Sequence, residues 1–211
     1  MNIQPIEKEL WEAADQLRAN SKLTAAEYSM PVLGLIFLRH ADNRYRAVLE
    51  QVLERLPKRD GKPLRSPRKE DFIGQAAIFL PASARYEYLA GLARGDNVGQ
   101  AIDDAMQAIE EEYEILKGAL PRGFTAFEPD LLAELLKIFN REALKQATGD
   151  VFGRIYEYFL NKFAQSGGAQ EGGEFFTPPS LVRMIVNVTE PDHGIVLDPA
   201  ALVQSDYSPT H

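Results

Sequence analysis

The stretch TAAEYSMPVLGLIFLRHADNRYRAVLEQVLERL, residues 24–56, decides the fold class of this chain. Apolar side chains recur three or four positions apart from Val32 to Leu53, which is typical of one long helix with a buried face. Thr24 followed by Glu27 forms a capping-box pattern at its start. Pro31 sits early, where a helix tolerates proline only in its first turn or at a kink. The stretch therefore predicts a mainly α protein.

Helical spacing continues on both sides of this segment. Residues 6–20 carry a single apolar stripe, and Asp96 or Asn97 can cap a helix over residues 98–117. Further helices are predicted over residues 81–93, 131–139 and 150–164. Between them, residues 57–69 contain three prolines and a glycine, so they are expected to form a loop.

That expected loop holds the only concentrated positive charge in a chain whose net charge is −8. Its basic residues stand against the single acid Asp60, and they are Lys58, Arg59, Lys62, Arg65, Arg68 and Lys69. A solvated loop is the simplest explanation of this composition. The functional alternative is contact with nucleic acid phosphate or with an acidic partner surface. The acidic balance elsewhere argues against a chain that grips DNA through its bulk charge.

Several classes of site are excluded by composition. The chain has no Cys, which rules out disulfides and thiolate metal ligands, and its three His residues (His40, His193 and His211) have no ligand spacing. No metal site is therefore predicted. The longest apolar run, residues 32–38, is far shorter than the roughly 20 residues of a membrane span, and residues 1–10 do not resemble a signal peptide. We expect a cytoplasmic protein without a membrane contact.

The sequence changes character after residue 165. The segment SGGAQEGG, residues 166–173, is expected to be a hinge or a closely approached loop. A helix over residues 181–188 and a strand over residues 194–197 follow, with Asp198 at the strand's end. The order of helix, turn, strand and acid is typical of the start of an α/β nucleotide-binding domain. Residues 201–211 show no periodicity, and nothing after the strand is expected to pair with it.

Two groups of segments resemble a known family. LWEAADQLRAN (residues 10–20) and YSMPVLGLIFLRHAD (residues 28–42) resemble the helical N-terminal domain of modification subunits from type I restriction–modification systems. DVFGRIYEYFLNKFA (150–164), GEFFTPPSLVRMIV (173–186) and VLDPA (196–200) resemble the start of the same family's adenine-N6 methyltransferase domain. The resemblance runs in order along nearly the whole chain and leaves out the last eleven residues.

The resemblance implies an architecture and a reaction. It implies a helical domain over residues 1–148, then the first helix and strand of a truncated α/β Rossmann-like methyltransferase domain over residues 149–200, and a tail outside the family over residues 201–211. Such subunits methylate adenine N6 in double-stranded DNA, using S-adenosylmethionine. They work with a specificity subunit and a nuclease subunit, and a homodimer is also possible. The target base must leave the stack for the chemistry to reach it.

The resemblance also assigns cofactor-binding residues by position. In the family the segment at residues 174–179 lies against S-adenosylmethionine, and a second element follows the strand. The residues carried over are Glu174, Phe175, Phe176, Thr177, Pro178, Pro179, Asp198, Pro199 and Ala200. The alternative for the first six is a helix N-cap with buried aromatic side chains. Leu202 stands where the family has a glycine, which would put a side chain into the cofactor's space.

No catalytic residue is assigned. The family's run of Asn or Asp, two prolines and an aromatic residue does not occur in this sequence. We therefore expect a truncated subunit that acts only as a partner-binding and DNA-binding module. A frameshift, decay of the gene or an artificially chosen end point would each explain the shortening. The alternative is a free-standing helical interaction or dimerisation protein, with the acidic helix over residues 98–117 as its contact surface. No arrangement typical of another enzyme class is present.

Overall fold

The computed structural model describes residues 4–21, 23–92, 96–165, 179–189, 195–196 and 205–206. The chain divides into two compact units, Met1–Glu174 and Phe175–His211, and each is described by itself. The first unit is helical, with a single short hairpin among its described residues. The prediction of a mainly α protein is confirmed.

The long helix expected from residues 24–56 is the spine of the first unit. Helix α2 (Ala25–Arg55) follows α1 (Gln4–Ser21), and the Thr24 side chain accepts a hydrogen bond from the amide of Glu27 at 3.3 Å. The Glu27 carboxylate accepts in return from the Thr24 amide at 2.9 Å, which completes the capping box. Pro31 lies inside α2 and is buried, and the helix continues past it.

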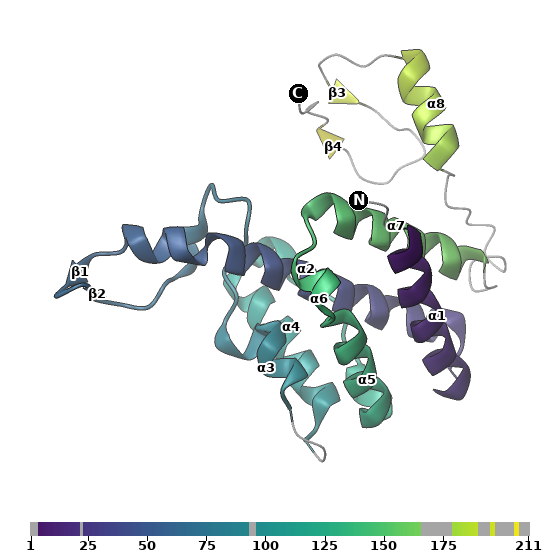
Figure 1. Cartoon of the computed structure of the whole chain (residues 1–211), viewed down its shortest axis with the longest axis horizontal. Helices are drawn as coiled ribbons and strands as arrows, with labels where there is room; N and C mark the ends of the chain where they lie inside the picture. The colour runs from purple at the N-terminus through teal and green to yellow at the C-terminus, as the bar shows by residue number, and fades with distance from the viewer. Residues whose placement is uncertain are drawn as a thin grey trace. The chain divides into compact units, whose positions relative to one another are not determined.

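Shorter helices surround this spine (Figure 1). The α-helices are α3 (Tyr86–Ala90), α4 (Val98–Glu112), α5 (Pro129–Phe139), α6 (Glu142–Lys145) and α7 (Gly149–Gln165). Single turns of 3₁₀ helix lie between them, namely η1 (Lys69–Phe72), η2 (Ala82–Ala84), η3 (Glu114–Leu116) and η4 (Phe124–Ala126). The expected helices at residues 131–139 and 150–164 are confirmed as α5 and α7.

Two of the predicted helices are shorter in the structure than the sequence indicated. The segment expected as one helix over residues 81–93 is split into η2 and α3, because Arg85 between them is extended. The helix expected to reach residue 117 ends at Glu112, since Tyr113 leaves helical geometry. The Tyr113 hydroxyl accepts a hydrogen bond from the Phe79 amide at 2.7 Å. Helix α4 thus ends where Tyr113 forms a hydrogen bond with Phe79, a residue of another segment.

The core of the first unit is one continuous cluster, to which α1, α2, α4, α5 and α7 contribute together with α3 and the 3₁₀ turns. The ring of Trp11 in α1 packs edge-on against Phe159 and Phe163 of α7, at centroid distances of 5.4 Å and 5.0 Å. Edge-to-face packing at this spacing stabilises aromatic pairs beyond the area that they bury. The Tyr28 hydroxyl in α2 donates to the carbonyl of Ala14 at 2.8 Å, which ties α2 to α1.

A buried arginine joins α2 to distant parts of the chain. Arg39 is 0% exposed, and its guanidinium donates to the Asp42 carboxylate at 2.8 Å and to the Asn140 side chain at 2.9 Å. It also donates to Asn43 at 2.9 Å and lies 4.7 Å from the ring centre of Tyr86. Burial lowers the pKa of Arg39, and the neighbouring Asp42 opposes that shift. We call Arg39, Asp42, Asn43, Tyr86 and Asn140 the arginine cluster.

The second unit has a helix and a two-stranded ladder among its described residues. Helix α8 (Pro179–Thr189) confirms the expected helix, and β3 (Ile195–Val196) confirms the expected strand. The expectation that nothing pairs with that strand is wrong, since β4 (Ser205–Asp206) pairs with it in antiparallel register. Antiparallel neighbours need only a short connection, whereas a parallel pair needs a crossover of a dozen or more residues. The segment between β3 and β4 is too short for such a crossover.

Candidate nucleic-acid interface

The segment expected as a loop contains a β-hairpin, which corrects the prediction. Strands β1 (Lys58–Arg59) and β2 (Lys62–Pro63) pair in antiparallel register, with Arg59 opposite Lys62. Asp60 and Gly61 form the two-residue turn, and both have positive φ angles, 52° and 77°. Two residues of positive φ are the hallmark of a type I′ turn, for which Asp-Gly is a favoured sequence. The amide of Leu64 donates to the carbonyl of Pro57 at 2.8 Å and closes the base of the hairpin.

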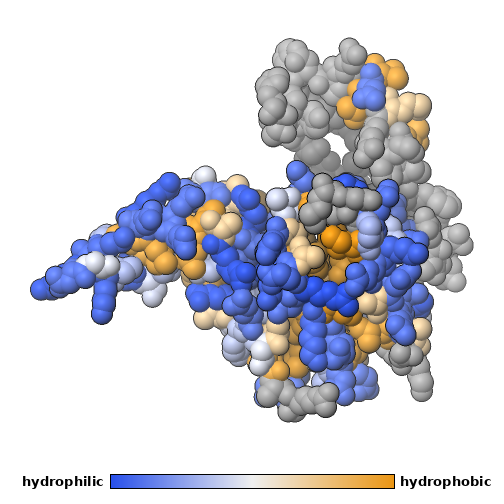
Figure 2. Space-filling view, viewed as in Figure 1, coloured by the Kyte–Doolittle hydropathy of each residue, from blue (hydrophilic) through white to orange (hydrophobic). Residues whose placement is uncertain are grey.

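We call residues 57–64 the basic finger. Within the first unit it extends beyond the end of α2, on the side opposite α1 and α7 (Figure 1). Lys58, Arg59 and Lys62 are exposed, and the space-filling view shows a hydrophilic tip there (Figure 2). Among the residues that the structure describes, no ion pair neutralises these three side chains. An acidic chain thus presents unneutralised cations at one end of its helical unit.

The remaining predicted basic residues hold the finger's return segment in place. The Arg65 guanidinium donates two hydrogen bonds to the Asp71 carboxylate, at 2.6 Å and 2.7 Å. The Arg68 amide donates to the same carboxylate at 2.8 Å, and the Lys69 ammonium donates to the Glu112 carbonyl at 3.1 Å. Arg65 and, after it, the Arg68 amide hold the pKa of Asp71 at about 2. Arg65 and Lys69 therefore use their side chains inside the protein. Lys58, Arg59, Lys62 and Arg68 keep exposed side chains without an ion pair among the described residues.

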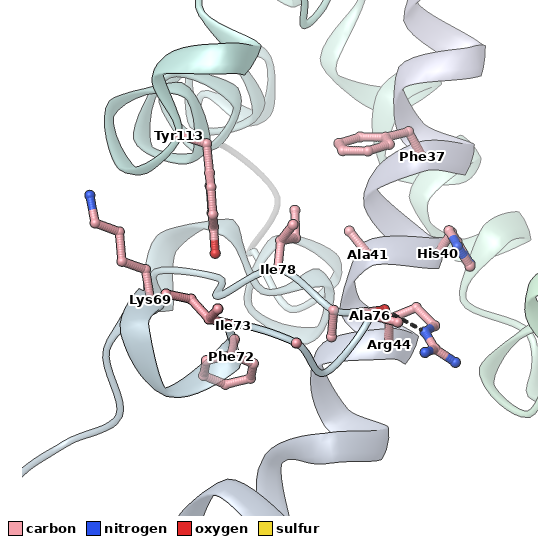
Figure 3. A pocket seen from close by; sticks show the side chains of 12 residues that line it. Phe37, His40, Ala41, Arg44, Lys69, Phe72, Ile73, Ala76, Ile78 and Tyr113 are labelled. Atoms are coloured by element: carbon pink, nitrogen blue, oxygen red, sulfur yellow. Dashed lines mark hydrogen bonds between the residues drawn. The ribbon is translucent and has the colours of Figure 1, made fainter. Parts of the chain in front are cut away.

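A pocket lies beside the return segment, between α2 and residues 69–78 (Figure 3). It has a volume of about 440 Å³ and an apolar lining that includes Phe37, Phe72 and Ile78. Figure 3 shows Tyr113 and Phe37 on opposite sides of the pocket. The Arg44 side chain donates a hydrogen bond to the carbonyl of Ala76 at 3.0 Å. Nothing in the sequence pattern predicted this pocket, because its lining comes from three separate segments.

His40 and Phe37 also line a second apolar pocket of about 420 Å³, which faces α7. His40 packs on the ring of Phe152 at a centroid distance of 5.0 Å. Its Nδ1 is buried without a hydrogen-bond partner in the described part of the chain. Burial, and then the charge of Arg44, lower the pKa of His40, which favours its neutral form. A neutral imidazole with one free nitrogen can accept or donate one hydrogen bond.

The predicted cofactor-binding residues fall almost entirely outside the described residues. Residues 174–178 and 198–200 belong to that set, and of Pro179 the structure gives only its place as the first residue of α8. These assignments stay predictions. Within the described ranges no group of acids and histidines could hold a metal ion, and no helix is long and apolar enough to cross a membrane.

The sequence held a signal for the hairpin that the prediction of a loop passed over. The dipeptide Asp60-Gly61 is a favoured sequence for a two-residue hairpin turn, although its flanks are basic rather than alternating apolar residues. The arginine cluster had a signal as well, since Arg39 lies within an otherwise apolar run of a predicted helix. A charged residue on a buried face needs partners. Asp42 and Asn43 lie within one turn of the same helix, whereas Asn140 is distant in sequence.

Comparison with known proteins identifies relatives along most of the chain. Residues 6–139 match the family described as HsdM N-terminal domain, and residues 147–205 match the family described as N-6 DNA Methylase. The chain is 34% identical to the type I restriction enzyme MjaIX methylase subunit of Methanocaldococcus jannaschii, over 92% of this chain and 37% of that protein. It is 37% identical to the HindI methylase subunit of Haemophilus influenzae, over 57% of this chain and 32% of that protein. The chain thus spans about a third of the length of these relatives.

Proposed function

This chain belongs to the family of type I restriction enzyme methylase subunits, and on that premise we propose that its helical unit is a binding module. The module joins the subunit to its partners and helps to hold double-stranded DNA near the methylase domain. The observation that carries the proposal is the ordered match of both domains, residues 6–139 and then 147–205. The unneutralised cations of the basic finger supply the DNA contact.

The proposed reaction of the whole subunit is transfer of a methyl group to adenine N6 in duplex DNA. S-adenosylmethionine supplies that methyl group when it is bound. Residues 174–179 and 198–200 would hold it: Glu174 and Thr177 offer polar side chains, and Phe175 and Phe176 offer an apolar wall. Because α8 begins at Pro179, the segment before it leads directly into a helix start, where backbone amides are unpaired. Proline suits the first position of a helix.

The 211 printed residues are proposed to bind without catalysing methyl transfer. They contain no Asn or Asp followed by two prolines and an aromatic residue, the run that would position the target amine. Incubation of the purified chain with adenine-containing duplex DNA and labelled S-adenosylmethionine should give no labelled DNA. Label on adenine would contradict this part of the proposal.

The proposed partners are the specificity subunit, which reads the DNA sequence, and the nuclease subunit, in the cytoplasm. Co-expression with the specificity subunit of the same system should give a complex that survives purification. A stable dimer of the chain that ignores this subunit would contradict the proposal. It would favour the alternative of a free-standing dimerisation protein.

The DNA contact can be tested in the same complex. Replacement of Lys58, Arg59, Lys62 and Arg68 by Ala should weaken DNA binding at low salt and flatten its salt dependence. Arg65 is kept in this variant because its side chain holds Asp71. A control variant removes two exposed cations elsewhere, Lys8 on α1 and Lys137 on α5, each paired with a neighbouring acid. Unchanged affinity in this variant would remove both the finger and the neighbouring Arg68 from the proposed function.

A further inference from the structure

Both faces of the basic finger are open to a ligand. Successive side chains of a strand point to opposite faces, so Lys58 and Pro63 share one face and Arg59 and Lys62 share the other. All four residues are exposed. A surface patch that lies flat on phosphates would need cations on one face only. Cations on both faces suit a ligand that surrounds the finger.

The pairing inside the finger is unfavourable without a ligand. Arg59 and Lys62 stand directly opposite one another across the two strands. Like charges at opposed positions of an antiparallel pair destabilise it, and negative charge nearby offsets that cost. The Asp60 carboxylate lies in the turn between them, but it forms no ion pair with either among the described residues. The pair is therefore suited to a strongly negative environment.

The dimensions of the finger fit one groove of duplex DNA. Two paired strands lie about 4.8 Å apart, and at about 3.3 Å per residue a two-residue strand with its turn reaches roughly 10 Å. The major groove is about 12 Å wide and 8.5 Å deep and admits a two-stranded ribbon without deformation. The minor groove is only about 6 Å wide, and a ribbon that enters it needs the DNA to be bent or widened. In the major groove the phosphates form the two walls, and base edges form the floor.

We propose that the basic finger enters the major groove of the DNA, an inference that rests on the proposed function for the presence of duplex DNA. Lys58 would then face one phosphate wall, and Arg59 and Lys62 the other wall or guanine edges. Asp60 at the tip meets the floor, where a carboxylate accepts a hydrogen bond from a cytosine amino group. Among phosphates alone, that carboxylate would be repelled.

The finger's base is already ordered for this role. The bidentate bond between Arg65 and Asp71, and the bond from Lys69 to the Glu112 carbonyl, fix the segment that returns from the finger to η1. The type I′ turn fixes its tip. A segment that is ordered before binding loses less conformational entropy when it binds.

A tethered probe tests the groove. Because the chain has no cysteine, Lys62→Cys places an iron–EDTA group at one position of the chain, with Lys137→Cys on α5 as the control position. The labelled chain is assembled with its specificity subunit, whose cysteines have been replaced, on duplex DNA. Hydroxyl radicals released in the major groove cut the two strands with an offset toward their 5′ ends, and radicals released in the minor groove give an offset toward the 3′ ends. The 5′ offset is expected from position 62 and no focused cutting from position 137.

Three results would overturn the inference. The first is a 3′ offset, and the second is DNA cutting no stronger than that from position 137. The third is cleavage of a partner polypeptide in place of DNA, because that result would assign the finger to an acidic protein surface. A second variant combines Lys58→Ala, Arg59→Ala and Lys62→Ala, and it should lower the slope of log affinity against log salt by about three. An unchanged slope also counts against the inference. Assembly and DNA binding of the same complex are measured in parallel, so failure of the proposed function appears there separately.

Discussion

The arginine cluster and the basic finger use the same kind of side chain in opposite ways. Arg39 is fully buried, and its guanidinium is bonded to side chains of α2 and to Asn140. Arg59 is exposed in the finger, and no partner in the described residues neutralises it. An arginine whose donors are used inside the fold contributes to structure, while one whose donors are left in solvent is available to a ligand. Arg65 lies between these cases, since it braces the finger from its base.

The largest expected effect is the loss of the buried arginine. Arg39→Ala should lower the free energy of unfolding by about 3–5 kcal/mol, because the buried Asp42 carboxylate loses its fully buried cation and keeps only the Tyr86 amide and the more distant Arg46. Chemical denaturation of the purified protein measures this. The control Arg18→Ala removes an arginine that is partly exposed on α1, and it should cost less than about 1 kcal/mol. Equal losses in free energy of unfolding for the two variants would contradict the distinction between buried and exposed arginines.

A smaller and local effect is expected at the finger's turn. Gly61→Ala should destabilise the hairpin by about 1–2 kcal/mol, because an alanine at a φ of 77° is strained. Hydrogen exchange of the Leu64 amide, which is bonded to the Pro57 carbonyl, should become roughly tenfold faster. The unfolding midpoint of the whole unit should stay unchanged. Asp60→Asn is the control, since asparagine tolerates positive φ, and faster exchange there as well would refute the explanation.

The ion pair between Arg65 and Asp71 at the base of the finger should be detectable in an acid titration. The pKa of Asp71 is lowered to about 2, mainly by Arg65, so the stability from this ion pair is present above the ordinary aspartate pKa of about 4 and is lost as the pH falls through about 2. Arg65→Ala should move the Asp71 midpoint up toward the ordinary value, as measured by carbon NMR of the carboxyl group. A midpoint that stays near 2 in the variant would assign the shift to the Arg68 amide instead.

The smallest effect on stability is expected from the finger's own cations. Lys58→Ala, Arg59→Ala and Lys62→Ala together should change the free energy of unfolding by less than about 0.5 kcal/mol, because the three side chains are exposed and unpaired among the described residues. Removal of the opposed pair of cations should favour the hairpin slightly, because like charges no longer face one another across the strands. A loss of several kcal/mol in a denaturation experiment would mean that these residues serve the fold.

Local sequence signals predicted the helices, and distant contacts account for what was missed. The apolar spacing of residues 24–56 and the pair of Thr24 and Glu27 were sufficient to place α2 and its cap, because both depend on neighbours within a few positions. The place of Asn140 in the arginine cluster could not be predicted in this way, since it lies 101 positions from Arg39. The early end of α4 involves Phe79, which lies far from Tyr113 in sequence.

The basic composition of the candidate site was predicted from the sequence, but its hairpin and its internal bonds were not. The concentration of basic residues in the segment after Pro57 was evident, and it did not show which of them are bonded inside the protein. That division depends on Asp71 and Glu112, whose positions only the fold determines. The cofactor-binding residues stay predictions, because residues 174–178 and 198–200 lie outside the described ranges.

Helix α7 has a consequence for how such subunits can exchange parts. The match to the methylase family begins at residue 147, before α7, yet Phe159 and Phe163 of α7 pack in the first unit against Trp11. A chimera between relatives that crosses over at residue 147 would therefore divide one core between two parents, whose side chains never adapted to each other. A crossover after Gln165 would carry the helix with the core that it completes. Recombination within this family should tolerate the second boundary better than the first.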